Sequence, residues 1–361
     1  MATVQFLTTK DISPNTHSII YPLLRWEKSL NSEIGVTKIV SNEVKENSDI
    51  IILDSKYHKY WWLDKNLGQK AVLEDIERIK KKCNKLVYFD TTDSSGSIQK
   101  EVFQKINQYW KGQTLVEKKL YKKNFFYDRV FTDYYKRKYF KEVDNAQNSE
   151  DILTVNDILK IKTAWNSSLT SYKYIGGRIA RFATKYKIGF LLNKNIVINE
   201  IKKIRRKKIS CRIFSDYNNQ LISWQREKAR YLLEDLCDTN LISKRKYHKE
   251  LSESKITFSP FGWGEICYRD FEAYCSGSLL IKPSMEHIET WPNLYINNQT
   301  YIACRWDLED LIDLINKYSN KKELQIPKNA QSIYNRFLDT VSGQIEFTKR
   351  YKNLVTELLE S

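Results

Sequence analysis

The chain has 361 residues, of which 41% are hydrophobic and 13% aromatic, with only 11 Gly and 6 Pro. This composition leaves little room for disordered linkers and supplies enough apolar surface for two ordered domains. The 60 basic and 44 acidic side chains give a net charge of +16, which favours a polyanion, an anionic membrane surface or a phosphate-bearing substrate as partner. Abundant Lys, Ile and Asn, as an AT-rich coding sequence produces, explain the same charge without any such partner.

The cysteine spacing and the absence of long apolar runs limit the cellular compartment in which we expect the protein. The six cysteines lie far apart, without CxxC pairs and without a histidine at ligand spacing. We therefore expect reduced, structural thiols and no metal site built from them. No DxD motif occurs either, because Asp90-Thr91-Thr92-Asp93 has the wrong spacing, so we expect no metal ion and no bound cofactor. The chain opens on an apolar strand pattern without a basic leader, and no run of 18 apolar residues occurs. These features predict a cytoplasmic protein, either soluble or peripheral to the inner face of the cell membrane.

Strand and helix patterns alternate in the first 90 residues. Buried strands are predicted over 4–8, 36–40, 49–54 and 85–89, and an amphipathic helix over 70–83. This alternation is typical of a parallel sheet covered by helices. The last of these strands leads into the polar loop 90–96, which contains Asp90 and Asp93. The loop therefore lies at the carboxyl edge of the predicted sheet.

The middle of the chain is aromatic and basic before the alternation restarts. Residues 109–141 are rich in Lys, Tyr and Phe, 145–150 read as a loop, and 155–169 as a helix that carries Trp165. The run 202–208 is basic, and we expect it to be solvated. A strand over 209–214 begins a second sheet, which places a domain hinge near 187–208. Helices over 224–236 and 246–252 follow.

The most specific segment runs from Ser259 to Asp310. An apolar strand over 255–259 leads into Pro260-Phe261-Gly262-Trp263-Gly264, where the glycines permit a tight turn close to a ligand. A helix is predicted from near Glu265 to Ser276, with its free N–H groups facing that turn. A short strand over 279–281 completes a half Rossmann repeat. Open α/β folds bind ligands at such an edge.

The remaining elements complete the second domain. Strands are predicted over 294–297 and 301–304, Asp307 is expected to cap a helix over 308–318, and 330–359 is helical by period.

The motif resembles the GT-B class of nucleotide-sugar glycosyltransferases. The pattern is SPFGWGEICYRDFEA...LLIKP...ETWPN, and bacterial transferases related to the group 1 and exostosin-like families carry it. The resemblance implies an α/β fold of two Rossmann-like domains facing a central cleft. It implies an acceptor-binding domain over 1–200, a nucleotide-sugar-binding domain over 201–335 and a C-terminal helix over 336–361 that crosses back to the first domain. The implied function is synthesis of a bacterial surface polysaccharide on a glycan or lipid-linked acceptor.

The pattern departs from the common retaining version at two places. Six residues separate Glu265 from Glu272, where seven are usual, and Gly264 stands where the first glutamate would fall. The usual Gly-Gly loop after the next strand is replaced by a segment that contains Lys282 and His287. Retention or inversion at the anomeric carbon therefore stays open.

The resemblance and the spacing assign donor-binding residues on the second domain. Glu272 matches the carboxylate that accepts ribose hydroxyls, and Arg269 lies at i+4 from Glu265 on the same helix face, where its fork suits a phosphate. The alternative for Arg269 is an exposed salt bridge with Asp270 or Glu265, and the alternative for Glu272 is a charge on the helix surface. A structural role is favoured for Asp270. Further expected contacts to the nucleotide sugar are Gly262, Trp263, Gly264, Lys282, Glu289 and Thr290.

Four residues are catalytic candidates. Glu265 lies against the donor sugar or caps its helix, and His287 in its polar turn is a ligand or a general acid or base. Asp90 and Asp93 are candidates for the general base of an inverting enzyme, with an Asx turn or helix cap as the alternative for Asp93. Trp263 stacks on a ligand or packs in the core.

Three other interpretations fit parts of the sequence. The basic aromatic segment 118–141 suits a lipid diphosphate or a membrane face, although an exposed helix with a packed aromatic stripe is the commoner outcome. The charge and the interleaved aromatics suit a nucleic-acid-binding protein, but no recognisable nucleic-acid motif supports that, and no nucleic-acid partner is expected. The altered glutamate spacing also fits a transferase-like binding module without activity.

Overall fold

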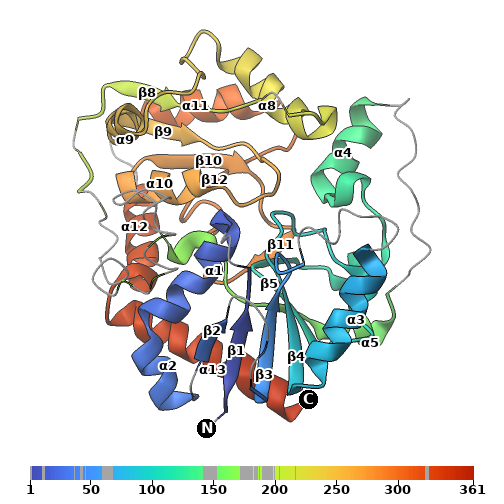
Figure 1. Ribbon diagram of the computed structural model, residues 1–361. Helices are drawn as coiled ribbons and strands as arrows, with labels where there is room; N and C mark the ends of the chain where they lie inside the picture. Colours follow the sequence, from blue (N-terminus) through green and yellow to red (C-terminus); the bar gives the residue numbers. More distant parts are fainter. Residues whose placement is uncertain are drawn as a thin grey trace.

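Two parallel sheets, one from each half of the chain, form the framework of the protein. Figure 1, a computed structural model, shows the first sheet below and the second above. The structure describes residues 2–9, 13–35, 37–40, 44, 46–58, 68–140, 153–170, 182, 186, 188, 198, 200–202, 204–215, 217–321 and 325–361. The predicted loop 145–150 and most of the expected hinge lie outside the described residues.

The first sheet has the strand order β2-β1-β3-β4-β5-β7, with every neighbouring pair parallel. Its strands are β1 (Val4–Leu7), β2 (Thr37–Val40), β3 (Ser48–Asp54), β4 (Cys83–Asp90), β5 (Gln108–Lys111) and β7 (Ile161–Thr163). Ile50 and Ile52 face one side and Ile51 and Leu53 the other, because successive strand residues point to opposite faces.

Helices cover both faces of this sheet. The Ile50 face packs against α1 (Pro14–Arg25), α2 (Glu27–Glu33) and α13 (Ser342–Glu360), and the Ile51 face against α3 (Gly68–Lys80). The hydrophobic strands predicted over the first 90 residues thus form the buried centre of the first lobe.

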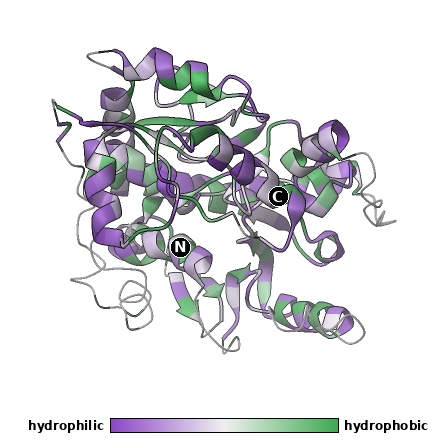
Figure 2. Cartoon of the chain, turned by 90° about the horizontal axis from the view of Figure 1, so that it is seen from above, coloured by the Kyte–Doolittle hydropathy of each residue, from purple (hydrophilic) through white to green (hydrophobic). Residues whose placement is uncertain are grey.

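The second sheet has the order β12-β10-β9-β8 and is also parallel throughout. Its strands are β8 (Lys207–Ser210), β9 (Ser254–Phe258), β10 (Leu279–Pro283) and β12 (Ile302–Cys304). One face packs on α8 (Gln220–Leu233) and α11 (Leu311–Ser319), and the other on α10 (Tyr268–Ser276) and α12 (Gln325–Leu338). α9 (Lys244–Glu253) packs beside α10. Figure 2 shows hydrophobic strands inside and more hydrophilic helices around them.

Among the described residues, α13, α4 and the strand pair β6–β11 are prominent connections between the lobes. The last helix, α13, crosses back to the first lobe, where Phe347 and Tyr351 join the core that contains Phe6 and Trp165. In the other direction α4 (Val130–Tyr139) lies beside α8, with ring centroids of Tyr135 and Trp224 4.6 Å apart. β6 (Gln113–Leu115) and β11 (Ile288–Thr290) form a two-stranded antiparallel sheet between the lobes.

Short 3-10 helices fill connections of the first lobe. They are η1 (Lys100–Val102), η2 (Lys118–Lys122), η3 (Phe126–Asp128) and η4 (Ser167–Leu169). No helix in the described part of the chain is long and apolar enough to cross a bilayer. The predicted aromatic stripe of 118–141 is packed, because Phe131 and Tyr135 are buried against the second lobe.

The predicted helix over 155–169 is wrong beyond its first turns. α5 (Val155–Lys160) ends where Ile161 enters β7 and pairs with Tyr109 of β5. Trp165 follows in the core, where its indole N–H donates to Ile19 O at 2.9 Å. Burial of Ile161 and Trp165 against the sheet therefore outweighs the helical period.

Three boundaries in the last third also differ from the prediction. Residues 294–297 form no strand and contribute only an isolated bridge from Asn297 to Tyr301. Asp307 does not cap a helix, because ion pairs with Arg305 and Lys138 hold its carboxylate, and α11 begins at Leu311 after Asp310. The predicted tail helix is two helices, since Asp339 accepts the N–H groups of residues 341 and 342 and starts a new one.

Candidate functional site

The turn after β9 brings the second lobe into direct contact with the first. A Cβ on Gly264 would lie 1.7 Å from Asp93 O, so only glycine permits this approach. Gly262 is less constrained, because its Cβ would first meet the end of the Arg226 side chain at 2.7 Å. The second predicted glycine is therefore required by packing between the lobes.

Glu265 follows this turn and is completely buried at the junction. It accepts hydrogen bonds from the Ser95 N–H at 3.0 Å and from Ser95 Oγ at 2.6 Å. Gln113 Nε2 of β6 donates to it at 3.3 Å. Burial raises the pKa of Glu265, but His287 and the bonds from Ser95 outweigh it, so the net pKa is lowered. The carboxylate thus links three segments, two of them from the first lobe.

His287 lies beside this carboxylate. Its Nε2 is 3.5 Å from Glu265 Oε1, and its ring packs edge-on against Trp306 with centroids 4.8 Å apart. Its backbone carbonyl accepts the N–H of Val116 at 3.0 Å, which extends the pairing of β11 with β6. His287 is therefore held at the junction and not in an open loop.

Arg269 and Glu272 project from α10 toward α9. Both are partly exposed. Arg269 donates to Arg212 O at 2.7 Å, at the end of β8. Burial raises the pKa of Glu272, while Tyr247 and the charges of Arg269 and Lys244 oppose the shift. A cation, a carboxylate and a phenol are thus gathered at the carboxyl edge of the second sheet.

The N-terminus of α10 points to the first lobe. The Tyr268 hydroxyl donates to Pro14 O at 3.3 Å, at the first residue of α1. Asp270 is buried: it accepts the Cys267 N–H at 3.0 Å and the Tyr295 hydroxyl at 2.8 Å, and its carboxylate lies 3.2 Å from the ammonium of Lys282. Asp270 therefore has the structural role that the sequence favoured. Lys282 is also fully buried, and this ion pair occupies its ammonium.

Trp263 lies at the surface of the same turn. Its side chain is 45% exposed, with the Arg129 guanidinium 5.4 Å from the ring and the Tyr217 ring at 5.3 Å. Arg226 lies over Tyr217 at 5.2 Å and donates to Phe261 O at 2.6 Å. These cations and rings form an aromatic rim beside the lobe junction.

A small hollow opens to solvent at the carboxyl edge of the first sheet. Its walls come from the start of α1, the loop after β4, the β5–β6 turn and the segment after β7, and Ile266 of the second lobe closes one side. The hollow therefore adjoins the start of α10, two residues after Ile266.

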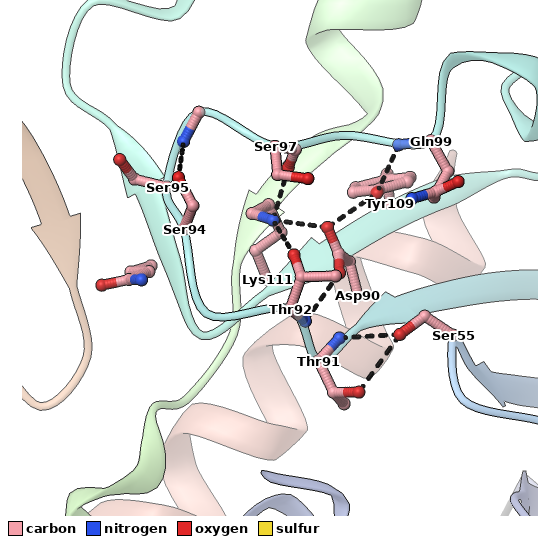
Figure 3. A network of polar contacts seen from close by, with 12 residues as sticks. Ser55, Asp90, Thr91, Thr92, Ser94, Ser95, Ser97, Gln99, Tyr109 and Lys111 are labelled. Atoms are coloured by element: carbon pink, nitrogen blue, oxygen red, sulfur yellow. Dashed lines mark hydrogen bonds and ion pairs between the residues drawn. The ribbon is translucent and has the colours of Figure 1, made fainter. Parts of the chain in front are cut away.

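The two aspartates of the first lobe have different surroundings. Asp90 is buried and forms an ion pair with Lys111, and the Tyr109 hydroxyl donates to it at 2.8 Å (Figure 3). Burial raises the pKa of Asp90, but Lys111 outweighs it, so the net pKa is lowered. Asp93 is exposed at the hollow and accepts the side-chain amide of Asn15 at 2.7 Å. Of the two, only Asp93 presents its carboxylate to solvent.

Glu289 and Thr290 lie in β11. Glu289 is opposite Thr114 of β6, and its carboxylate is 3.2 Å from the Lys118 ammonium. The Thr290 hydroxyl donates to Pro292 O at 3.1 Å and is nearly buried. Both residues thus belong to the connection between the lobes.

Two Rossmann-like lobes meet at this junction, and the last helix returns to the first lobe. The protein has a GT-B architecture.

Solved structures similar to this chain are ligand-bound proteins of low sequence identity. Anabaena HepE in complex with UDP and glucose is 10% identical, with a TM-score of 0.43 over 99% of this chain and 100% of HepE. An alpha-glucosyltransferase in complex with UDP is 10% identical, with a TM-score of 0.42 over 98% of this chain and 100% of that one. The pneumococcal O-GlcNAc transferase GtfA in complex with UDP and GlcNAc is 13% identical, with a TM-score of 0.37 over 82% of this chain and 61% of GtfA. No protein-family model and no curated protein matches the sequence.

Several residues at the site have no counterpart among the sequence-predicted ones. Tyr247 and Lys244 lie with Glu272, Ser95 and Gln113 bind Glu265, and Asn15 binds Asp93. Their side chains are common types without motif spacing, and long-range packing brings them to the junction. Among the described residues, no group of three or more His, Cys, Asp or Glu side chains could hold a metal ion.

Proposed function

We propose that this protein is a glycosyltransferase that moves a sugar from a nucleotide-sugar donor to a hydroxyl-bearing acceptor. The observation that carries this proposal is the pair Arg269 and Glu272 on one face of α10, at the carboxyl edge of the second sheet. A guanidinium suits a phosphate, and a carboxylate accepts two ribose hydroxyls. This edge is where parallel α/β sheets bind ligands, and α10 starts there with its positive dipole end.

The donor nucleotide is proposed to lie along α10, between α9 and the turn after β9. Glu272 binds the ribose with Tyr247 beside it, and Arg269 with the first N–H groups of α10 binds the diphosphate. Trp263 and the glycine turn face the sugar side. Lys282 would act indirectly, because it is buried with Asp270, which fixes the helix start.

Transfer at the junction requires removal of one acceptor proton. The acceptor oxygen bonds to the anomeric carbon, the bond from that carbon to the phosphate oxygen breaks, and its electron pair leaves with the nucleotide. The hydroxyl proton passes to a general base, for which we propose Asp93, since Lys111 already pairs with Asp90. Glu265 and His287 are proposed to position the two lobes around this centre.

The acceptor is proposed to be a glycan or lipid-linked saccharide of a bacterial surface polysaccharide, as the sequence resemblance implies. Basic side chains on α4 and in the 118–123 segment would support contact with an anionic membrane face. Binding of the purified protein to vesicles with and without anionic lipid measures that contact.

Donor binding is the direct test. A thermal-shift screen with UDP, GDP, CMP and TDP sugars should identify one nucleotide that raises the melting temperature. Glu272→Ala should weaken binding of that nucleotide by roughly tenfold to a hundredfold, the loss expected for hydrogen bonds to a charged group.

Glu227→Ala is the matched control, because Glu227 is an exposed carboxylate on α8 of the same lobe. It should bind the nucleotide as the unaltered protein does. Equal affinity of the Glu272 variant and the control would refute the assignment of this site.

A further inference from the structure

Short, anchored segments join the β6–β11 pair to both lobes. β6 follows β5 of the first sheet after a single residue, Gly112, and a Cβ on Gly112 would already lie 3.0 Å from Trp165 O. Close packing therefore fixes this end of the pair to the first sheet. The register then places Glu289, from the second half of the chain, directly opposite Thr114.

The segment around β11 is bound to the first lobe on both sides of its paired residues. The N–H of Val116 donates to His287 O at 3.0 Å, and the N–H of Asn166 donates to Trp291 O at 2.9 Å. With the three pairs between them, every residue from 287 to 291 contacts the first lobe. We call this segment, together with β6, the strap.

Both ends of the 287–291 segment are also anchored in the second lobe. On the side of β10, the N–H of Met285 donates to the Tyr301 hydroxyl at 3.0 Å. On the other side, the Tyr274 hydroxyl donates to Leu294 O at 2.8 Å. Met285 and Leu294 are both buried. Because the connecting residues have no free length, a hinge motion between the lobes has to break the strap or turn about it.

Contacts on either side of the strap oppose rotation about it. Figure 1 shows α4 on one side of β11 and α1 with α12 on the other. On the α4 side, Phe131 is buried against the second lobe, and Ser94 Oγ of the first lobe donates to Asp128 O, just before α4, at 3.0 Å. On the α1 side, the Tyr334 hydroxyl of α12 donates to Ser168 O of the first lobe at 2.6 Å. Rotation in either direction therefore breaks one of these contacts.

The donor site proposed on α10 does not require the lobes to separate. Arg269 and Glu272 are partly exposed with the strap in place. Tyr247 and Lys244, which lie with Glu272, belong to the second lobe as well. A nucleotide therefore reaches these side chains without breaking any pair of the strap.

We propose that the strap holds the two lobes as one rigid body, so that ligands bind and leave while the lobes stay in place. The part that concerns the nucleotide rests on the proposed function, whereas the rigidity does not. Lobes that close around a ligand need hinge residues that absorb a change in backbone angles, and the residues that flank the strap are bound to their own lobes. Motion on ligand binding is then confined to side chains and loop tips.

A cross-link through the strap tests this. Thr114 and Glu289 are opposite each other in an antiparallel pair, where Cα atoms lie about 4.5–5.5 Å apart, within the range that a disulfide spans. The double variant Thr114→Cys with Glu289→Cys should therefore form a disulfide in the folded, ligand-free protein. The two single variants are the controls, because they cannot form this bond and they report any bond to the native cysteines.

Binding of UDP, GDP, CMP and TDP is then compared by calorimetry in the oxidised and the reduced double variant. Rigid lobes predict dissociation constants that agree within about threefold, because the cross-link removes no state that the free protein populates. A larger change in either direction, reversed by reduction, overturns the proposal. Tighter binding would show that the lobes close on the nucleotide, and weaker binding would show that they have to open to admit it.

Amide hydrogen exchange gives a second measurement, on the unaltered protein. Without ligand, the amides of the strap, such as that of Val116, should exchange at least about a hundredfold more slowly than in an unfolded chain. Weaker protection, or protection that appears only with a nucleotide bound, overturns the rigid body, as does a disulfide that forms only after unfolding. If none of the four nucleotides binds the unaltered protein, the proposed function fails, and exchange and cross-linking alone decide whether the lobes are rigid.

Discussion

At the scale of single residues, Asp90 and Lys111 form a buried ion pair beneath the site. Both side chains are buried, and Lys111 also donates to Ser97 O at 2.7 Å, so one ammonium ties the end of β4 to the loop that follows it (Figure 3). Breaking such a pair leaves an uncompensated charge in the interior. The loop that presents Asp93 therefore depends on a residue in the neighbouring strand.

Lys111→Met should destabilise the protein by about 3–5 kcal/mol near neutral pH, because it leaves the Asp90 carboxylate buried and unpaired. Urea unfolding measures this. Lys105→Met is the control, since its pair with Glu77 is at the surface and should contribute less than about 1 kcal/mol. Equal loss in both variants would contradict a special role for the buried pair.

The pH dependence of stability follows from the same pair. The folded-state pKa of Asp90 is lowered, so its stabilising contribution is present above the unfolded-state pKa, about 3.9 for a free aspartate, and is lost as pH falls through the lower folded value. In Lys111→Met this acid-side loss should vanish, because the unpaired Asp90 is already more stable protonated. The unfolding free energies of the unaltered protein and of Lys111→Met, measured from pH 6 to pH 3, should therefore converge toward low pH.

Gly264 and Gly262 give a matched comparison in one turn. Gly264→Ala places a methyl group 1.7 Å from Asp93 O, a backbone atom, so the lobes must separate locally. Gly262→Ala meets only the flexible end of Arg226 at 2.7 Å. The first change should lower the melting temperature more than the second, as thermal unfolding measures. The opposite order would mean that the turn does not pack against the first lobe as described.

At the scale of elements, the C-terminal helix α13 contributes side chains to the hydrophobic core of the first lobe. Phe347 is fully buried against Trp26 and Trp165, whereas Ile345 on the same helix is 60% exposed. Phe347→Ala should destabilise the protein by about 3–5 kcal/mol, and Ile345→Ala should stay within about 0.5 kcal/mol. Chemical denaturation of the two variants checks this. Similar losses would show that α13 does not dock by this face.

The sequence predicted the elements whose apolar pattern is long or continuous. Strands such as β3 and β9 and the amphipathic helix α3 are fully specified locally, because each buries a regular set of side chains. The strand β7 was missed, and β6 and β11 gave no signal, because each has only three residues and is extended through pairing with a distant segment.

The site residues also divide into those that local spacing predicts and those that only long-range packing brings together. Arg269 and Glu272 share a helix face, and local spacing was enough to bring them together. The bond of Glu265 to Ser95 was outside the reach of the sequence, because it joins residues 170 positions apart through the packing of two lobes. The unpaired oxygen of Gln113 likewise cannot be recognised from the sequence, because it is identified only once the two acceptors of the Gln113 amide are located in the structure.

At the scale of the whole molecule, two contacts at the junction respond differently to pH. Backbone pairing of β6 with β11 is independent of side-chain charge, whereas the Glu265 contact depends on an ionised carboxylate. The pKa of Glu265 is lowered in the folded protein, so its contribution is present above the usual carboxylate pKa and is lost as pH falls through the lower value. Acid should therefore loosen the contact at Ser95 before it separates the two paired strands.

Glu265→Gln should loosen the junction at neutral pH, because a neutral amide accepts a weaker hydrogen bond from Ser95 than a carboxylate does. The substitution also removes the negative charge beside His287. We expect faster amide hydrogen exchange in the 94–96 loop and in the 262–266 turn, with little change in β1 and β9. Glu286→Gln is the control, since Glu286 is an exposed carboxylate next to His287. If exchange in the loop and the turn were the same in both variants, the buried carboxylate would not hold the lobes, and the paired strands alone would account for their placement.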